Sequence, residues 1–471
     1  MRTQKVETMR VGVLAILLAL ILCAGSWAQG DDLAAQASKS LSAAVKYLTE
    51  TIAVGGGYLG SYKIDLQTGK FVDQWGEGHA TADQNWIQPP GCPSVGFAFL
   101  RAWQETGDPR NLDAAVQVAN SLVYGQLECG GWDYIVDHSP AGAVAWYYRH
   151  NRNSQDPKLK GGRNQATFDD NVTQHATRLL MAVDLALEQK DAAIHEASLA
   201  AIEFILQAQL PTGGWPQRSP RSSRGYSRYV TFNDNSMADC IDVMMRAWEA
   251  YGDPRTRESV VKAGQFIIDA QLPGQPTWAQ QYDEDLKPGW ARKFEPPSAC
   301  SSESVGVMRT LVRIATFLQD ERYLEPLPAA FEWFRVSELT GADKGKWARF
   351  YELGTNKPLY FTRDTYLLTY DDSDCPTHYS FKGSYSPASV KSEYDRIMEI
   401  GLTAYAKERS PRPLSDQAKR DLAKSLEGRV RETIDSQSDL GFWANGDMID
   451  MSVFERNIEL LAQYLGLVRN Q

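Results

Sequence analysis

Cysteine and histidine are scarce in this sequence, with six of each in 471 residues. No CxxC pair or other cysteine and histidine spacing typical of a zinc or thiol redox site is present, so the sequence predicts neither site. No spacing indicates a Ser/His or Cys/His catalytic pair. A surplus of positive charge is also missing, because the formal net charge is −10. That charge disfavours a general nucleic-acid binder or a protein that binds anionic membranes.

Long apolar runs are missing as well, with one exception near the N-terminus. Residues 11–23 are largely apolar, follow several basic residues and precede Ser26-Trp27-Ala28, which has the small-x-small form of a signal-peptidase site. The run is too short for a comfortable membrane span. We expect residues 1–28 to be a cleaved signal peptide and the mature protein to be secreted or periplasmic. Its five remaining cysteines are an odd number, so at least one is unpaired.

Internal repeats predict the architecture. Ala102-Trp103-x-x-x-Gly107-Asp108-Pro109-Arg110 returns as Ala247-Trp248-x-x-x-Gly252-Asp253-Pro254-Arg255, and Gln126-Leu127 returns as Gln271-Leu272 at the same offset. Between them, Gln209-Leu210-x-x-Gly213-Gly214-Trp215 matches Gln126-Leu127-x-x-Gly130-Gly131-Trp132. We interpret these Gln-to-Trp turns as structural, with Gly allowing a tight turn and Trp joining adjacent hairpins. The repeats indicate at least three similar units.

Each unit has the pattern of two amphipathic helices joined by a short turn. The expected hairpins are residues 94–104 with 112–124, 173–187 with 192–207, and 237–250 with 257–270. Further helices are expected over residues 33–51 and from about residue 304. Hairpins of this kind bury their apolar faces by packing side by side. The predicted fold class is therefore all-α: an α/α toroid, an incomplete (α/α)3-type barrel of helical hairpins.

The pattern changes after about residue 346. Residues 346–352 and 358–361 read as short strands around a Gly-Thr-Asn turn, and residues 415–435 and 452–468 read as helices. We expect residues 29–383 to form the toroid domain with a small β or irregular segment. We expect residues 384–471 to form an extension of extra C-terminal helices packed on that domain, and the protein to be a monomer.

Two short acidic stretches stand directly before predicted helices: Ala166-Thr167-Phe168-Asp169-Asp170-Asn171 and Thr231-Phe232-Asn233-Asp234-Asn235. Each follows a basic loop, with Arg149, Arg152, Lys158, Lys160 and Arg163 before the first and Arg218, Arg221, Arg224 and Arg228 before the second. Carboxylates bind Ca²⁺ and arginine forks bind carboxylates, so the pattern suits a hard cation with an anionic ligand. The structural alternatives are helix N-caps and solvated charged loops.

Several motifs, in order, resemble the pectate lyases of polysaccharide lyase family ten. In chain order, the motifs are Thr167-Phe168-Asp169-x-x-x-Thr173 with Arg178, Gly213-Gly214-Trp215-Pro216-Gln217, Tyr229-Val230-Thr231-Phe232-Asn233-Asp234-Asn235, Trp278-Ala279-Gln280-Gln281-Tyr282-Asp283, Ala291-Arg292-x-Phe294-Glu295-Pro296-Pro297, Ser302-Glu303-Ser304, Trp347-Ala348-Arg349-Phe350-Tyr351 and Arg363-Asp364. Together they cover roughly residues 88–379.

The resemblance implies a secreted lyase that cleaves polygalacturonate-type polyuronates by Ca²⁺-assisted β-elimination. It implies that Asp169 binds Ca²⁺, that Arg292 and Arg349 bind carboxylates, and that Arg363 is the Brønsted base. It further implies a substrate-binding set: Asp170, Asn171, Asp234, Asn233, Lys287, Arg228 and Tyr379.

The chain departs from the family pattern at two places. Asp169-Asp170 stands where the family has Asp-Asn, and Thr377-His378-Tyr379 stands where the family has an Arg-Arg-x-Gly-Tyr-x-Trp ending. Two alternatives therefore stay open. One is a protein that binds an anionic glycan without cleaving it. The other is a glycoside hydrolase on the same fold, in which Glu295 or Asp234 pairs with one of the two adjacent aspartates.

Overall fold

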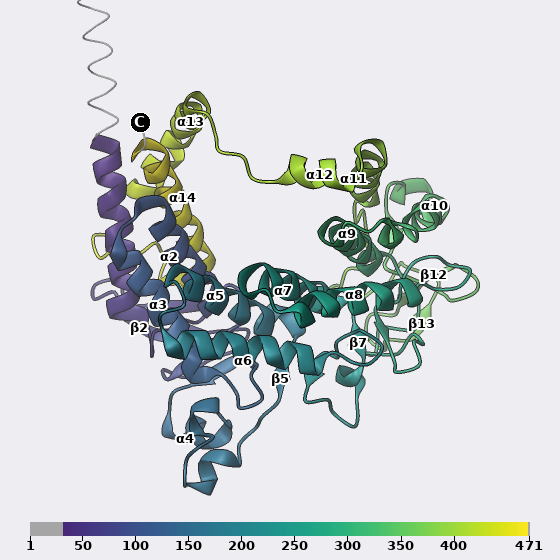
Figure 1. The fold of residues 1–471 in the computed structure, drawn as a ribbon, viewed down its shortest axis with the longest axis horizontal. Coiled ribbons are helices and arrows are strands. Elements are labelled where there is room, and N and C mark those ends of the chain that lie inside the picture. Colours follow the sequence, from purple (N-terminus) through teal and green to yellow (C-terminus); the bar gives the residue numbers. More distant parts are fainter. Residues whose placement is uncertain (1–31, 470–471) are drawn as a thin grey trace, which may run out of the picture. The chain divides into compact units, whose positions relative to one another are not determined.

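The computed structural model describes residues 32–469. The predicted signal peptide lies outside the described residues. The chain divides into two compact units (Figure 1). Unit 1 contains residues 32–82, 94–118 and 413–469, and unit 2 contains residues 83–93 and 119–412. Across residues 32–469, no helix combines the length and the apolar character needed to cross a membrane.

Unit 2 is built mainly from consecutive helical hairpins. The three hairpins are α5 (Val172–Ala186) with α6 (Ala192–Ala208), α7 (Ser236–Tyr251) with α8 (Pro254–Asp269), and α9 (Ser301–Leu318) with α10 (Leu327–Ser337). Helix α5 packs on α7 and α7 packs on α9, while α6 packs on α8, so α5, α7 and α9 form one row and α6 and α8 form another. The predicted fold class, mainly helical and of the α/α-toroid type, is confirmed. The pattern gave four of these helices to within a few residues but did not reveal α10.

The Gly-Asp-Pro-Arg repeat is a helix stop followed by a helix start. Gly252 ends α7 in the left-handed region with φ of 68°, which glycine adopts without steric cost. The Asp253 side chain then accepts from the backbone N–H of Arg255, and Pro254 occupies the first turn of α8. Because Gly107 also has positive φ and Asp108 accepts from the N–H of Arg110, the same sequence makes the same turn twice.

The Gln-to-Trp turns connect neighbouring hairpins through the glutamine. Gln209 Nε2 donates to the carbonyl of Gly213 in its own turn (2.8 Å) and to that of Ser259 in α8 (2.9 Å). Trp215 instead donates to Ile205 in α6, the helix that leads into the turn. The expectation that Trp joins the hairpins is therefore wrong for the hydrogen bond. The short glutamine amide reaches the next hairpin, whereas the Trp ring closes on its own helix.

A further copy of this turn lies in unit 1, where the sequence pattern was not recognised. Gln437 donates to the carbonyls of Gly441 and Ser40, each at 3.1 Å, and Trp443 donates to Thr433 at 2.8 Å. The sequence Gln437-Ser-Asp-Leu-Gly-Phe-Trp443 has the same spacing as the other turns. Its amide therefore ties the end of α13 (Asp416–Asp435) to the helix over residues 32–47.

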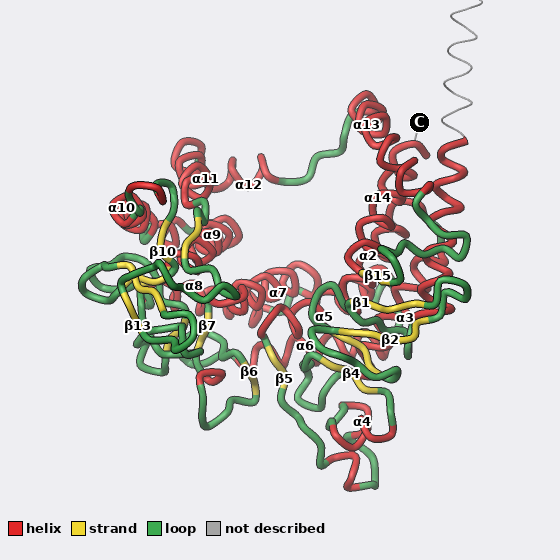
Figure 2. Tube along the Cα trace, turned by 180° about the vertical axis from the view of Figure 1, so that it is seen from behind, coloured by secondary structure: helices red, strands yellow, loops and turns green. Residues whose placement is uncertain are grey.

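Unit 1 combines helices with one small sheet. Helices α13 and α14 (Met451–Arg469) lie where the sequence predicted C-terminal helices, and they pack against each other. Strands β1 (Ser61–Ile64) and β2 (Phe71–Trp75) form a sheet with β15 (Met448–Asp450) in the order β15-β1-β2 (Figure 2). Most of α2 (Cys92–Thr106) and the first half of α3 (Pro109–Gly125) also belong to this unit.

Short strands of unit 2 lie in both stretches where the sequence predicted them, residues 346–352 and 358–361, whereas those at residues 299–300 and 368–369 were not predicted. Strands β9 (Ala299–Cys300), β11 (Phe350–Tyr351), β12 (Pro358–Phe361) and β13 (Leu368–Thr369) form one sheet in the order β13-β12-β11-β9. Phe350 pairs with Cys300, and the Arg349 carbonyl accepts from the N–H of Ser301. The sheet thus places Arg349 beside the first turn of α9.

The C-terminal segment is divided between the two units. Helices α11 (Pro387–Ile400) and α12 (Leu402–Arg409) pack on α9 in unit 2, whereas α13 and α14 lie in unit 1. The proposed domain boundary at residue 383 stays a prediction. The five cysteines of the described chain are all unpaired.

Replacement of Gln209 by alanine should lower the free energy of unfolding by about 1–3 kcal/mol, because two carbonyl groups lose their donor. Urea denaturation of the purified variant measures the change. Gln207→Ala is the matched control, since Gln207 bonds only Glu203 on the exposed side of α6. The control should change stability by less than about 0.5 kcal/mol. Equal losses in both variants would contradict the role given to Gln209.

Candidate functional site

The two acidic stretches fold into the same strained turn. Asp170 and Asn171 have φ of 47° and 62°, and Asp234 and Asn235 have φ of 48° and 56°. Asp and Asn are among the few residues that tolerate the left-handed region, and two such residues in succession mark a strained turn. The turns are η4 (Asp169–Asn171) before α5 and η6 (Asn233–Asn235) before α7, and neither helix receives a side-chain cap. The capping alternative is therefore wrong.

Matching residues hold each turn in place. Thr167 Oγ1 accepts from the N–H of Asp169, and Thr231 Oγ1 accepts from the N–H of Asn233, both at 3.1 Å. The following Phe168 is buried against α6 and its counterpart in the second turn is buried as well. The spacing that both stretches share thus builds two similar turns that carry polar side chains. The turns η4 and η6 pack against each other.

Three carboxylates meet where the two turns pack together. One oxygen from each of Asp169, Asp170 and Asp234 lies within 4.8 Å of the others. The Tyr134 hydroxyl donates to Asp170 Oδ2 (2.9 Å) and to Asp169 Oδ2 (3.2 Å). Asp169 Oδ1 is buried and has no hydrogen-bond partner within residues 32–469. An oxygen-only donor set with an orphaned carboxylate oxygen fits a hard cation such as Ca²⁺.

Burial and the charge of this cluster together raise the pKa values of Asp234 and Tyr134. The pKa of Asp234 is raised to about 6, first by partial removal from water and then by the charges of Asp169, Asp170 and Glu303. Burial and the same two aspartates raise the pKa of Tyr134, which keeps the phenol a donor.

The amides of the two turns are engaged in different ways. Asn233 donates to the Asp234 carboxylate, whereas Asn171 accepts from the Arg178 guanidinium. Arg178 is nearly buried and also pairs with Asp239 (3.1 Å) and Asp242 (2.8 Å) on α7. Arg178 therefore links the first turn to the helix that follows the second turn.

Arg292 and Arg349 both lie over the ring of one tyrosine. The Tyr379 ring centroid is 5.4 Å from the Arg292 guanidinium carbon and 4.6 Å from that of Arg349. Arg292 pairs with Glu295 at 2.6 Å, and Arg349 pairs with Glu303 at 2.5 Å. The sequence named both arginines and Tyr379 as site residues, and the structure brings these three together.

The two buried glutamates fix the charge of these arginines. Hydrogen bonding to Glu295 raises the pKa of Arg292; for Arg349, burial lowers the pKa but the charge of Glu303 and neighbouring groups outweighs it. Burial would raise the pKa of Glu295, but the hydrogen bonds from Arg292 and other donors lower it overall. Both arginines are therefore firmly cationic.

The arginine pair is linked to the acidic cluster through Asp234 and Glu303. The charges of Asp234 and Arg292 act on each other, and Glu303 also raises the pKa of Asp234. Asp234 and Glu303 both line a hollow of about 210 Å³ between the first turns of α7 and α9. Sequence reasoning gave Glu303 no role, although its place between two serines, directly before the predicted helix start, was a usable signal.

Arg363 is placed differently from the other two arginines. Its side chain is half exposed; its Nε donates to the Cys375 carbonyl at 3.2 Å and lies 3.5 Å from an Asp374 oxygen. Within the described residues it makes no contact with the acidic cluster, Arg292 or Arg349. Its assignment as the base stays a prediction.

Two further predicted residues also lie apart from the cluster in their contacts. Lys287 is exposed and its ammonium is 3.7 Å from Asp285. The Arg228 guanidinium lies over the Tyr229 ring, 5.3 Å from its centroid. Their substrate-binding roles stay predictions.

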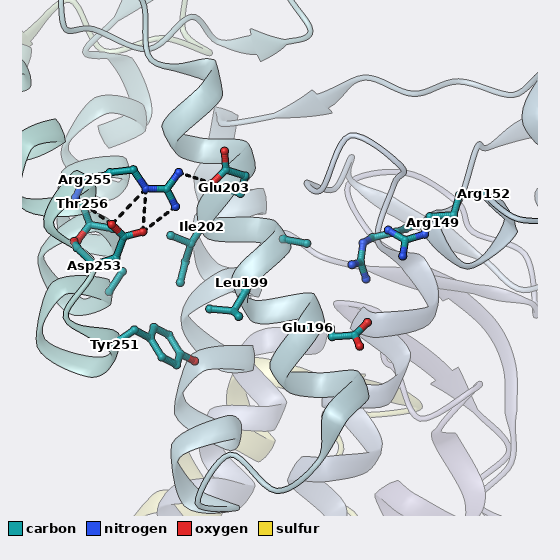
Figure 3. Close-up of a pocket in the computed structure, with 12 residues that line it drawn as sticks. Arg149, Arg152, Glu196, Leu199, Ile202, Glu203, Tyr251, Asp253, Arg255 and Thr256 are labelled. Carbon is teal, nitrogen blue, oxygen red and sulfur yellow. Dashed lines mark hydrogen bonds and ion pairs between the residues drawn. The ribbon is translucent and has the colours of Figure 1, made fainter.

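The first basic loop is divided between two places. Arg149 and Arg152 line a hollow of about 610 Å³ on the α6 side of unit 2 (Figure 3). On the other side of this hollow, Arg255 pairs with Asp253 (2.7 Å) and Glu203 (2.9 Å). Only Arg163 of this loop reaches Asp133, the residue before Tyr134, at 3.5 Å.

Comparison with known proteins gives one family. The family model described as pectic acid lyase matches residues 126–386. A family 10 polysaccharide lyase from Cellvibrio cellulosa is 24% identical, with a TM-score of 0.47 over 66% of this chain and 97% of that chain. A mutant of a family 10 lyase from the same organism, in complex with trigalacturonic acid, is 23% identical, with a TM-score of 0.46 over 66% and 98%.

A family 76 glycoside hydrolase, an α-mannanase from Bacteroides thetaiotaomicron, is 10% identical, with a TM-score of 0.41 over 93% of this chain and 94% of that chain. No curated protein matches the chain.

The raised pKa of Asp234 predicts a pH-dependent cost to stability. A carboxyl group that binds its proton more tightly when folded lowers the free energy of unfolding as pH rises from about 4 to about 6. Asp234→Asn removes this cost. In chelator, the variant should therefore gain stability over the wild type across that interval and keep the gain above it. Urea denaturation at a series of pH values measures this.

Excess Ca²⁺ should reverse the order at pH 7, because the wild-type carboxylate then has a cation to bind. A difference between variant and wild type that does not change with pH would show that the carboxylates do not interact as described.

Proposed function

We propose that this protein, which belongs to the pectic acid lyase family, is a secreted pectate lyase that cleaves polygalacturonate-type polyuronates by Ca²⁺-assisted β-elimination. It acts as a monomer outside the cytoplasm. One observation carries the proposal: an oxygen-only cluster of Asp169, Asp170 and Asp234 is linked, through the charges of Asp234 and Glu303, to two firmly cationic arginines. A cation site beside arginine forks is what a chain of carboxylated sugars requires.

The reaction must remove the proton on the carbon next to the uronate carboxylate and expel the sugar linked at O4. Neutralising the carboxylate makes this proton more acidic, because the transition state carries enolate-like charge on the carboxylate oxygens. Asp169, Asp170 and Asp234 would hold Ca²⁺, with the buried Asp169 Oδ1 as one ligand. A bound Ca²⁺ supplies charge stabilisation to the substrate carboxylate.

Arg292 and Arg349 bind substrate carboxylates in this proposal. Arg292 is the more accessible, with 46% of its side chain exposed against 17% for Arg349. Each guanidinium is oriented by a buried glutamate and lies against Tyr379, so little rotational freedom is lost when a carboxylate binds. Their raised pKa values support binding rather than proton abstraction.

The base in this proposal is Arg363, on the strength of the family resemblance alone. Arginine is rarely deprotonated in proteins, so this role requires a setting that disfavours its charge. Arg363 must also reach the groove that contains Asp169, because proton transfer requires near contact. Its present partners are a backbone carbonyl and the exposed Asp374, both of which a substrate chain could displace.

The two alternatives differ in how well the geometry supports them. Glu295 is buried, ionised and held by Arg292 and by the Tyr379 hydroxyl at 3.0 Å, so it is not free to act as the acid of a hydrolase. A glycan-binding protein without activity uses the same contacts as the lyase. An assay of the reaction product is therefore needed to distinguish binding from cleavage.

Polygalacturonate treated with the protein and Ca²⁺ should give 4,5-unsaturated ends, followed by their ultraviolet absorbance, and the activity should disappear with chelator. Reducing ends without unsaturation would indicate a hydrolase. Binding without either product would indicate a glycan-binding protein.

Asp169→Ala should abolish the activity at ordinary Ca²⁺ concentrations, because the buried ligand oxygen is lost. Its thermal unfolding temperature, measured in chelator, should stay close to that of the wild type, since Asp169 caps no helix. Asp395→Ala is the control, because Asp395 is an exposed partner of Lys391 on α11. A large loss of stability in the first variant would assign Asp169 a structural role instead.

Arg363→Lys separates charge from proton transfer, because it keeps a cation but replaces the planar fork with an ammonium of different pKa. If Arg363 is the base, kcat should fall by orders of magnitude and the pH profile should move. Arg349→Lys should mainly raise KM, since that residue binds substrate. A change in KM alone for both variants would show that the base is another residue.

A further inference from the structure

Two arginines from different basic loops converge on one buried aspartate. Arg163 Nη1 lies 3.5 Å and Arg218 Nη1 lies 3.1 Å from the same oxygen, Asp133 Oδ2. The Asp133 side chain is only 5% exposed, whereas those of Arg163 and Arg218 are 60% and 27% exposed. Asp133 Oδ1 accepts from the N–H of Tyr134. The aspartate is thus fixed in the protein, and the guanidinium groups reach from it toward solvent.

This group lies directly beside the acidic cluster. Tyr134, next to Asp133 in the chain, donates its hydroxyl to Asp169 and Asp170. Arg218 is paired with Thr167 across two short strands, β5 (Ala166–Thr167) and β6 (Arg218–Ser219), so it lies opposite the residue two positions before Asp169. The Arg218 guanidinium also lies 6.0 Å from the Tyr134 ring centroid.

The charges of the group do not balance. Two guanidinium groups share one carboxylate oxygen, which leaves one net positive charge. The remaining donors of both guanidinium groups have no hydrogen-bond partner in residues 32–469, although the Arg163 guanidinium carbon lies 4.7 Å from the Trp146 ring centroid. Free forked donors of one planar guanidinium match the two oxygens of a carboxylate.

An aromatic surface adjoins the free donors. The rings of Trp86 and Tyr134 are stacked with centroids 5.5 Å apart, and both residues are partly exposed. A sugar ring presents an apolar face as well as polar groups, and aromatic rings supply contact area with little loss of side-chain freedom.

We infer that Asp133, Arg163 and Arg218 form a further uronate subsite, in which Arg218 and Arg163 bind the carboxylate of a sugar next to the unit held at the acidic cluster, with Tyr134 and Trp86 beside its ring. The inference rests on the proposed function for the chemistry of the ligand. A purely structural ion pair is the competing explanation. Under that explanation the ion pair of Arg163 would contribute little to stability, because Arg163 is mostly exposed and its distance to Asp133 is long.

Calorimetric titration with trigalacturonate in the presence of Ca²⁺ tests the subsite without requiring cleavage. The contact time must be short, or Arg363, the proposed base, must be replaced. Arg218→Gln and Arg163→Gln should each weaken binding, Arg218→Gln by about ten- to hundredfold, as expected for loss of a charged hydrogen-bond pair. Arg218→Lys should recover part of the loss. Arg335→Gln, at an exposed arginine on α10 that pairs with Glu332, should bind as the wild type does.

On polygalacturonate the same variants should raise KM while kcat stays within about twofold of the wild type, and their thermal unfolding temperatures should change little. Unchanged trigalacturonate binding in Arg218→Gln and Arg163→Gln, or no binding to the wild type, overturns the inference. If the wild type binds trigalacturonate and Arg218→Gln binds it more weakly, but no unsaturated product forms, the subsite stands and the lyase proposal fails.

Discussion

Three carboxylates held within 4.8 Å repel one another, and neighbouring groups of unit 2 offset part of that repulsion. Tyr134 supplies a hydroxyl proton, Asp234 holds its own proton up to a pH of about 6, and Arg292 supplies a nearby positive charge. None of these satisfies Asp169 Oδ1. A cluster that is only partly compensated is chemically suited to a divalent cation, and the strained left-handed turns that carry it are the kind of backbone found at binding sites.

The arginines near this cluster are each held by an acid that is more buried than they are. Glu295 holds Arg292, Glu303 holds Arg349, and Asp133 holds Arg218. A buried carboxylate that is paired keeps its charge and orients the guanidinium, while the outer donors stay available to a ligand. The same arrangement therefore occurs three times, and an anionic polymer would meet oriented forks there instead of flexible side chains.

The hairpin architecture followed from the sequence because its signals are local and repeated. Gly-Asp-Pro-Arg ends one helix and starts the next through interactions within a few residues, so the boundaries of α7 and α8 could be predicted closely. The turn from Gln437 to Trp443 carries the same spacing, with different residues at the intervening positions. Helix α10 and the sheet of β1, β2 and β15 had no such signal, since β15 lies far from its partners in the chain.

The sequence by itself determined which residue types carry the site: the repeated Asp and Asn turn, and the motifs with Arg292, Arg349 and Tyr379. These are short patterns whose chemistry is legible without coordinates. Only the tertiary structure decided that the two turns meet and that the site is held together by Tyr134, Glu295, Glu303 and Asp133. It also decided that one arginine of each basic loop pairs with Asp133, while the contacts of the other cations in those loops lie elsewhere. The physical reason is that direction and pairing depend on packing between hairpins, because a side chain's partners are set by neighbours distant in sequence.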